Sequence, residues 1–267
     1  MSETADAFDP APAAAMLADA WRRGTLLAEL PQAIRPRTMA QGYDVQDRLV
    51  AELGQTPVGW KLGVGSARQK RQSGVGRSIA GRVFGSRLHR PGDVVALPNA
   101  APVTIEFEVA YVLGRDVLPD EAEVPILDAV AETRVAFELV LSRFTDRRAV
   151  GWPSFAADNG AFQALVLGDP IAPARLDELA GDLVVTVDGR EAARSLTGED
   201  ATDPQAALAD LVATARERGM VLPKGGIVST GTVSKPFDLA VPSAEVGARY
   251  LGTELRFRTG VGQSDAG

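Results

Sequence analysis

Three glutamates, two of them on one short stretch, are the side chains of this sequence with the clearest potential for chemistry. Residues 103–114 alternate with period two, which predicts a strand that ends at Gly114. Because side chains alternate across a strand, Glu106 and Glu108 point to the same side, roughly 7 Å apart at the backbone. Two like charges at that distance repel each other unless water or a cation intervenes. For such a pair taken alone, a strand with one hydrated face is the simpler explanation.

A third carboxylate favours a cation site. Glu138 lies within residues 135–141, a run so apolar that it predicts a strand buried on both faces. A glutamate in such a run needs a partner, because burying a lone charge costs too much free energy. Three carboxylates on two strands offer the oxygen ligands that Mg²⁺ and Mn²⁺ prefer. A divalent-cation site is therefore the hypothesis that the rest of the chain has to support.

The composition excludes several other classes of site. The 267 residues include no cysteine and one histidine, His89, which excludes disulfides, thiolate chemistry and a histidine-based zinc site. The length allows one large domain, or one domain with a smaller cap. No apolar run approaches the roughly 20 residues needed to span a bilayer, and the first residues lack the basic start of a signal peptide. We expect a cytoplasmic protein with no membrane partner.

The formal net charge of −7 hides one basic segment. Residues 61–92 contain eight lysines and arginines and no acidic residue. The simpler interpretation is a solvated segment that lies against an acidic neighbour; the alternative is a positive field that attracts an anionic small molecule. Phe84 is the only aromatic residue in the segment and the whole chain is acidic, so we expect no nucleic acid partner.

The elements that must position these groups follow from spacing and turn residues. Lys61 lies in a short stretch flanked by glycines, where a ligand can approach the backbone closely. A strand lysine that faces solvent is the alternative. The chain predicts helices at 12–23, 39–53, 126–133 and from Pro204 onward, a loop at 151–162, a hairpin around Asp188–Gly189 and a closing strand at 249–258. We expect an α+β protein, with an α-rich cap segment and the first strand at 1–85 and a β-rich catalytic core at 86–267.

Five short motifs together resemble a known family. They are Gly59-Trp60-Lys61-Leu62-Gly63, Ile105-Glu106-Phe107-Glu108-Val109-Ala110, Phe137-Glu138-Leu139-Val140-Leu141-Ser142-Arg143, Ala157-Asp158-Asn159-Gly160 and Thr230-Gly231-Thr232. Their order and spacing are similar to those of the 2-keto-4-pentenoate hydratase and 4-oxalocrotonate decarboxylase family, within the fumarylacetoacetate hydrolase superfamily. The resemblance covers roughly residues 12–258.

This resemblance implies a fold and a reaction. It implies a mixed β-roll core of the fumarylacetoacetate hydrolase C-terminal type, with Mg²⁺ or Mn²⁺ on Glu106, Glu108 and Glu138. It implies a small 2-oxo or 2-hydroxydienoic acid as substrate and Lys61 as the catalytic residue that holds the substrate carboxylate or moves a proton. The expected activity is a hydratase that converts a 2-hydroxy-2,4-dienoate into a 4-hydroxy-2-oxo acid, with 4-oxalocrotonate-type decarboxylation as the alternative.

The resemblance also suggests residues around the substrate. We expect Asp158, Asn159, Gly231 and Thr232 to lie near it. Arg77 departs from the family, because it stands where an acidic residue is usual. That change puts ordinary hydratase activity in question, and a positive side chain there favours a substrate with a second carboxylate.

Two further interpretations of the sequence are kept open. A C–C bond hydrolase of the same superfamily would use a His–Glu pair, and His89 lies in the wrong segment for that role. A binding protein that kept the fold and the cation, without catalysis, is the other interpretation. The resemblance further implies a homo-oligomer, and we also consider a complex with an enzyme of the same pathway.

Overall fold

The computed structural model describes residues 8–121, 125–172, 175, 178, 183–239 and 243–261. The chain divides into two compact units: Met1–Gln55 with Ser142–Ala161, and Thr56–Leu141 with Phe162–Gly267. Both units are discontinuous in sequence, and the predicted boundary between residues 85 and 86 falls inside the second unit. A division of the chain into domains at that point stays a prediction.

The first unit is helical and agrees with the predicted helices at 12–23 and 39–53. Its helices are α1 (Ala11–Arg23), α2 (Met39–Leu53) and α4 (Trp152–Ala157). The first ends at Gly24 in the left-handed region, with φ of 63°. The Thr38 hydroxyl caps the second by accepting a hydrogen bond from the Gln41 N–H at 3.2 Å. Apolar residues of α1 and α2 form the buried core of this unit.

Helix α4 corrects the predicted loop at 151–162. Gly151, with φ of 79°, precedes the helix, and proline occupies its first turn. The helix packs closely on α2, where a Cβ added to Gly42 would lie 2.4 Å from the Pro153 carbonyl oxygen. Gln46 of α2 donates from Nε2 to the Ala156 carbonyl oxygen at 2.7 Å. Because these contacts join distant residues, local sequence signals do not reveal them.

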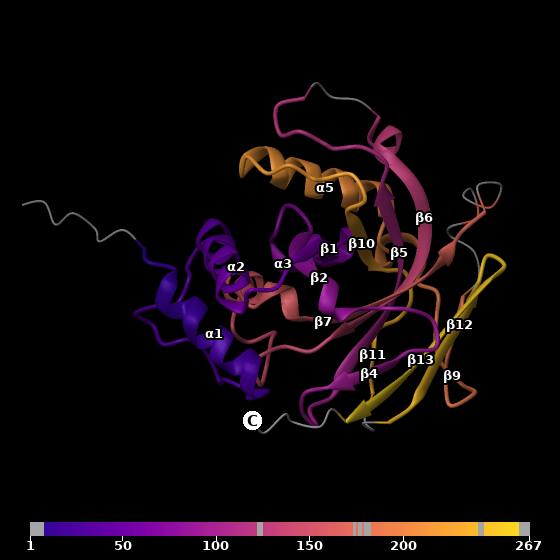
Figure 1. The fold of residues 1–267 in the computed structure, drawn as a ribbon, viewed down its shortest axis with the longest axis horizontal. Helices are drawn as coiled ribbons and strands as arrows, with labels where there is room; N and C mark the ends of the chain where they lie inside the picture. The colour runs from indigo at the N-terminus through magenta and orange to yellow at the C-terminus, as the bar shows by residue number, and fades with distance from the viewer. Residues whose placement is uncertain are drawn as a thin grey trace, which may run out of the picture. The chain divides into compact units, whose positions relative to one another are not determined.

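The second unit contains two sheets (Figure 1). The larger has eight strands in the order β2-β1-β10-β5-β6-β7-β3, with β11 beside β5. Its strands are β1 (Pro57–Gly63), β2 (Ile79–Phe84), β3 (Leu88–His89), β5 (Val103–Leu113), β6 (Val130–Val140), β7 (Phe162–Pro170), β10 (Ile227–Thr232) and β11 (Phe237–Leu239). Strand β1 pairs with β10 in parallel and β10 pairs with β5 antiparallel, so this sheet is mixed.

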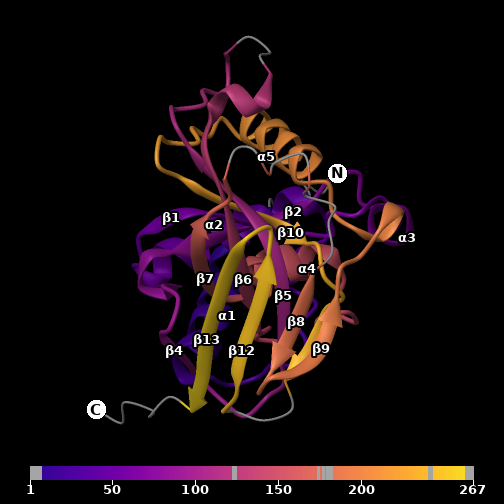
Figure 2. The same ribbon diagram turned by 90° about the vertical axis from the view of Figure 1, so that its right-hand side faces the viewer.

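The smaller sheet covers one face of the larger one (Figure 2). Its strand order is β4-β13-β12-β8-β9, with bounds β4 (Val94–Leu97), β8 (Val184–Val187), β9 (Arg190–Arg194), β12 (Glu245–Tyr250) and β13 (Thr253–Val261). Aromatic rings join the two sheets: Phe107 lies 5.5 Å from Tyr250, and Phe137 lies 5.3 Å from Phe257, between centroids. The odd-numbered side chains of β5 therefore belong to a core, as the alternation predicts.

Two predicted elements of this unit differ from the structure. The expected helix at 126–133 is a single 3₁₀ turn at Ile126–Ala129, after which β6 begins at Val130. The expected closing strand at 249–258 is a hairpin, because Leu251 and Gly252 adopt φ of 50° and 79° and reverse the chain between β12 and β13. The predicted hairpin around Asp188–Gly189 is confirmed as β8 and β9.

The basic segment 61–92 includes a helix that the sequence analysis does not predict, α3 (Ala67–Ser73). A capping box formed by Ser66 and Gln69 begins it. It lies against an acidic neighbour, the 3₁₀ turn Gly198–Asp200 and helix α5 (Pro204–Glu217). The ion pairs are Arg68–Asp200, Lys70–Asp210, Arg71–Glu199 and Arg77–Glu217. Among the described residues, no helix combines the length and apolar character needed to cross a bilayer.

Candidate active site

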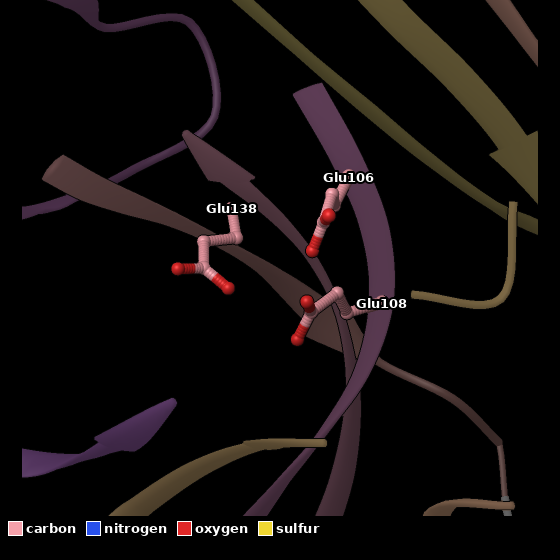
Figure 3. A group of neighbouring side chains, drawn as sticks. All are labelled: Glu106, Glu108 and Glu138. Carbon is pink, nitrogen blue, oxygen red and sulfur yellow. The ribbon is translucent and has the colours of Figure 1, made fainter. Parts of the chain in front are cut away.

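The structure brings the three predicted glutamates together. Strands β5 and β6 pair so that Glu106 lies opposite Glu138, and Glu108 lies two residues farther along β5 on the same face. One carboxylate oxygen of each glutamate lies within 4.8 Å of the others. Figure 3 shows the three side chains converging on one space from their two strands. The antiparallel register creates this cluster, since it places one position of β6 beside two alternate positions of β5.

Burial makes the cluster electrostatically costly without a cation. Glu108 and Glu138 are fully buried, whereas Glu106 is partly exposed. Burial, and secondarily the charges of Glu138 and Glu106, raise the pKa of Glu108 well above its ordinary value. Burial likewise raises the pKa of Glu138 to about 7, and the nearby Lys61 ammonium opposes the shift. No N–H or hydroxyl donor among the described residues bonds to Oε1 of Glu108 or Oε2 of Glu138. Buried carboxylate oxygens without donors suit a divalent cation.

Lys61 is the buried cation of this cluster. Its side chain is 2% exposed, and Nζ lies 3.0 Å from Oε1 of Glu138. Strands β10 and β5 separate β1 from β6, a span of roughly 14 Å in a flat sheet. The two side chains meet because the sheet curls around the site. The sequence alternative of a solvent-facing lysine is therefore wrong.

The second oxygen of Glu108 is held by two donors on β10. The Ser229 hydroxyl donates to Oε2 at 2.5 Å, and the Gly231 N–H donates to the same atom at 2.9 Å. The sequence predicts Gly231 near the substrate, whereas in the structure its N–H contacts a glutamate of the cluster. Ser229 is a residue that the sequence analysis misses. Local sequence patterns do not indicate it. Only the parallel pairing of β1 with β10, which places Ser229 opposite Lys61, marks its position.

Thr232, also predicted near the substrate, is engaged with the backbone. Its hydroxyl lies 2.7 Å from the Ser234 carbonyl oxygen and 3.3 Å from that of Phe107. These bonds stabilise the end of β10 beside β5, and the side chain is buried. Contact between Thr232 and a substrate stays a prediction.

Arg77 has an acidic partner within the second unit. Its Nη2 lies 2.5 Å from Oε1 of Glu217 on α5, and both side chains are substantially exposed. A salt bridge of this exposure contributes little to stability. The predicted role of Arg77 at a substrate carboxylate stays a prediction, and such a role requires it to share or leave Glu217.

Asp158 and Asn159 belong to the first unit. The Asp158 carboxylate is fully buried and accepts hydrogen bonds from Arg143 Nε at 2.5 Å and from the Ser142 hydroxyl at 2.7 Å. Burial raises the pKa of Asp158, and the Arg143 guanidinium opposes this. Asn159, with φ of 54°, begins a run of three left-handed residues that ends at Ala161. Their predicted place near the substrate stays a prediction.

The sequence profile of the family described as Fumarylacetoacetate (FAA) hydrolase C-terminal matches residues 75–253. The chain belongs to the fumarylacetoacetate hydrolase family. This confirms the family, the α+β class and the mixed β-roll core expected from the sequence.

Relatives within the family include two kinds of lyase. A "4-oxalocrotonate decarboxylase" of a Pseudomonas species is 26% identical over 200 residues, covering 74% of this chain and 77% of the relative. A "2-keto-4-pentenoate hydratase" of Paraburkholderia phymatum is 28% identical over 225 residues, covering 82% and 86%. A "TodF product hydratase" of Pseudomonas putida is 32% identical over 170 residues, covering 61% and 62%.

Solved structures of the family share the fold at low sequence identity. The 4-oxalocrotonate decarboxylase from Pseudomonas putida G7, complexed with magnesium and adipate, matches with a TM-score of 0.82 and 20% identity. That match covers 93% of this chain and 96% of the other. The fumarylpyruvate hydrolase from Pseudomonas aeruginosa, in complex with Mn²⁺ and pyruvate, matches with a TM-score of 0.54 and 15% identity over 76% and 89%.

Proposed function

We propose that this protein is a divalent-cation-dependent lyase that hydrates a 2-hydroxy-2,4-dienoate to a 4-hydroxy-2-oxo acid. The observation that carries the proposal is the cluster of Glu106, Glu108 and Glu138, whose oxygens lie within 4.8 Å of one another. Relatives named hydratase or decarboxylase support a lyase, and solved relatives complexed with magnesium or Mn²⁺ support the choice of cation.

The three glutamates would hold Mg²⁺ or Mn²⁺. Such a cation supplies Lewis acidity toward a 2-oxo acid, stabilising negative charge that develops on the 2-oxo oxygen. The chain's own contribution is a curled sheet that holds the carboxylates in place on two paired strands. Two of them are fully buried, so the protein stabilises their charged forms poorly by itself.

Lys61 is the residue we propose for proton transfer or for holding the substrate carboxylate. Hydration of 2-hydroxypenta-2,4-dienoate balances in two steps. First the proton leaves the 2-hydroxyl and one is added at C5, giving a 2-oxo-3-enoate. Then the hydroxyl of water bonds to C4 while a proton adds to C3. Both steps need a group that moves protons, and the Lys61 ammonium is buried beside Glu138.

Decarboxylation of 4-oxalocrotonate is the second candidate, favoured by the decarboxylase relative and by the TM-score of 0.82. There the C5–C6 bond breaks and CO₂ leaves. The electron pair of that bond moves through C4 and C3 to the 2-oxo oxygen, which takes up a proton to give 2-hydroxypenta-2,4-dienoate. The substrate has a second carboxylate, for which Arg77 is the proposed ligand. A His–Glu hydrolase is less favoured, because His89 lies on β3 with Asp93 as its carboxylate neighbour, 3.9 Å away.

The other residues near the substrate, the oligomeric state and the partners expected from the sequence are also proposals. We propose Asp158, Asn159, Gly231 and Thr232 as residues near the substrate. A homo-oligomer in the cytoplasm, with a small acid as its ligand and an enzyme of the same pathway as a further partner, is the setting we propose for this activity.

The test is the loss of ultraviolet absorbance of 2-hydroxypenta-2,4-dienoate with Mg²⁺, with Mn²⁺ and with a chelator, followed by product analysis. We expect cation-dependent decay to 4-hydroxy-2-oxopentanoate, abolished in Glu106→Ala. Lys61→Met should lose roughly 100-fold or more in kcat while still binding Mn²⁺. Release of CO₂ from 4-oxalocrotonate without hydration of the dienoate would favour the second candidate, and no turnover of either acid would contradict both.

A further inference from the structure

Ser229 and the backbone at Gly231 form a small polar clamp on one oxygen of Glu108. Both donors bond to Oε2, at 2.5 Å from the Ser229 hydroxyl and 2.9 Å from the Gly231 N–H. No donor among the described residues bonds to Oε1 of the same carboxylate, which is also buried. The two oxygens of Glu108 are therefore in different environments.

The local backbone of β10 is built for this contact. Ser229 lies opposite Ala110 of β5 and Thr232 lies opposite Glu108, so the register shifts between them. That irregularity turns the Gly231 N–H toward Glu108 instead of into the regular ladder. Gly231 has φ of 99°, and an added Cβ would lie 3.1 Å from both the Leu62 carbonyl oxygen and the Thr202 hydroxyl. The backbone conformation therefore favours glycine, and a Cβ there would make tight contacts.

The position of Ser229 in the sheet also allows it to hold Glu108. It lies between the strand of Lys61 and the strand of Glu108, paired with Lys61 on β1 and with Ala110 on β5. Its side chain is fully buried and donates to Glu108. A hydroxyl in this position fixes the rotation of the carboxylate about the Cγ–Cδ bond, because it holds one oxygen and leaves the other to face the cluster.

We propose that Ser229 is a positioning residue, which with the Gly231 N–H holds Glu108 so that Oε1 is the atom offered to the cation. This inference rests on the proposed function, in that it assumes a divalent cation at the three glutamates. Hydrogen bonds of this kind to a ligating carboxylate change metal affinity by roughly 10–100-fold when they are lost.

The test is the affinity for Mn²⁺, measured by titration calorimetry and by the electron paramagnetic resonance signal of free Mn²⁺. Ser229→Ala should raise the Kd roughly tenfold or more, and Ser229→Thr, which keeps the hydroxyl, should stay within about threefold of the wild type. Thr230→Val is the matched control. Thr230 is equally buried, but its hydroxyl donates to the Val109 carbonyl oxygen at 2.7 Å and not to a glutamate. Its loss should lower stability and leave the Kd within about twofold.

The outcomes separate this inference from the proposed function. Ser229→Ala binding Mn²⁺ as tightly as the wild type overturns the positioning role, and so does an equal loss in Thr230→Val. A wild type that binds Mn²⁺ but turns over neither acid contradicts the proposed function alone, while the Kd comparison still decides the role of Ser229. A wild type that binds no Mn²⁺ overturns both. Should Ser229→Ala fail to fold, Ser229→Cys retains the size of the side chain with a weak donor, and its Kd should also rise.

Discussion

At the scale of single residues, the buried pair of Glu138 and Lys61 makes the stability of the protein depend on pH. The ammonium of Lys61, 3.0 Å away, only partly offsets the burial of Glu138, whose pKa is about 7 instead of 4.5. The native protein therefore keeps a proton that the unfolded chain releases. The contribution of this proton to the free energy of unfolding is fully present below about pH 4.5 and is lost as the pH rises through about 7.

The raised pKa of Glu138 should make the free energy of unfolding depend on pH. Without cation, the free energy of unfolding should fall by about 1 kcal/mol more between about pH 6 and pH 8 in the wild type than in Glu138→Gln. The comparison with Glu138→Gln is needed because other groups titrate too. Burial raises the pKa of Glu108, which works in the same direction as Glu138, and lowers the pKa of His89, which works in the opposite direction. Urea unfolding at both pH values measures the difference. Stabilisation by added Mg²⁺ should be larger at the higher pH, and an equal or reversed effect would contradict the account.

Residue roles are predictable from sequence only where local geometry sets them. The alternation of a strand is enough to place Glu106 and Glu108 on one face, and the apolar surroundings of Glu138 are enough to mark it as unusual. The contacts of Ser229 and Asp158 are made with residues outside their own elements, Glu108 and Arg143. No spacing rule connects Ser229 to Glu108, 121 residues apart.

At the scale of elements, close packing of α2 on α4 explains why Gly42 is a glycine. Alanine in its place would bring a Cβ to 2.4 Å from the Pro153 carbonyl oxygen. We expect Gly42→Ala to destabilise the protein by about 2 kcal/mol, although alanine is the better helix former by about 1 kcal/mol. Thermal or urea unfolding measures this. Ala51→Gly, at an exposed position of α2, serves as the control and should cost no more than about 1 kcal/mol. A Gly42→Ala variant more stable than the wild type would show that the two helices are not packed as described.

Asp210 on α5 anchors the middle of the basic segment 61–92. Its Oδ2 accepts hydrogen bonds from the N–H and hydroxyl of Ser78, each at 2.8 Å, and from Lys70 Nζ at 2.5 Å. Lys70 and Asp210 are both mostly buried. Asp210→Asn leaves that ammonium without its counter-charge, and we expect a loss of about 1–3 kcal/mol.

The matched control for Asp210 is the exposed pair between Arg71 and Glu199. Both of its side chains are more than half exposed, so Arg71→Gln should change stability by less than about 0.5 kcal/mol. Denaturant unfolding of both variants makes the comparison. A similar small change in the two variants would mean that Asp210 does not anchor the segment.

Elements with strong local signals are predicted well, and those that depend on distant contacts are not. Caps and periodicity are sufficient for α1 and α2, and the Asp188–Gly189 turn is sufficient for its hairpin. Helix α4 escapes prediction because its packing partner α2 lies far earlier in the chain. The β12–β13 hairpin escapes prediction because Leu251 in a left-handed conformation is not a turn signal in sequence.

At the scale of the whole molecule, five motifs in register are enough to indicate the family from the sequence alone. The family profile spans residues 75–253, and the glutamate cluster lies within that span. Lys61 lies outside it, on a strand whose pairing with β10 brings it to the same face of the sheet. The matched span therefore contains the three glutamates but not the lysine that lies beside Glu138.

The most direct test of the account is the stoichiometry of Mn²⁺ binding at about pH 8, above the raised pKa of Glu138, measured by titration calorimetry on the wild type, Glu108→Gln and Glu132→Gln. Glu132 is the control, an exposed glutamate on β6 that pairs with Arg134. We expect one Mn²⁺ per chain in the wild type and in Glu132→Gln, and binding weakened roughly 100-fold or more in Glu108→Gln. No binding by the wild type, or undiminished binding by Glu108→Gln, would contradict the claim that these three glutamates form a divalent-cation site.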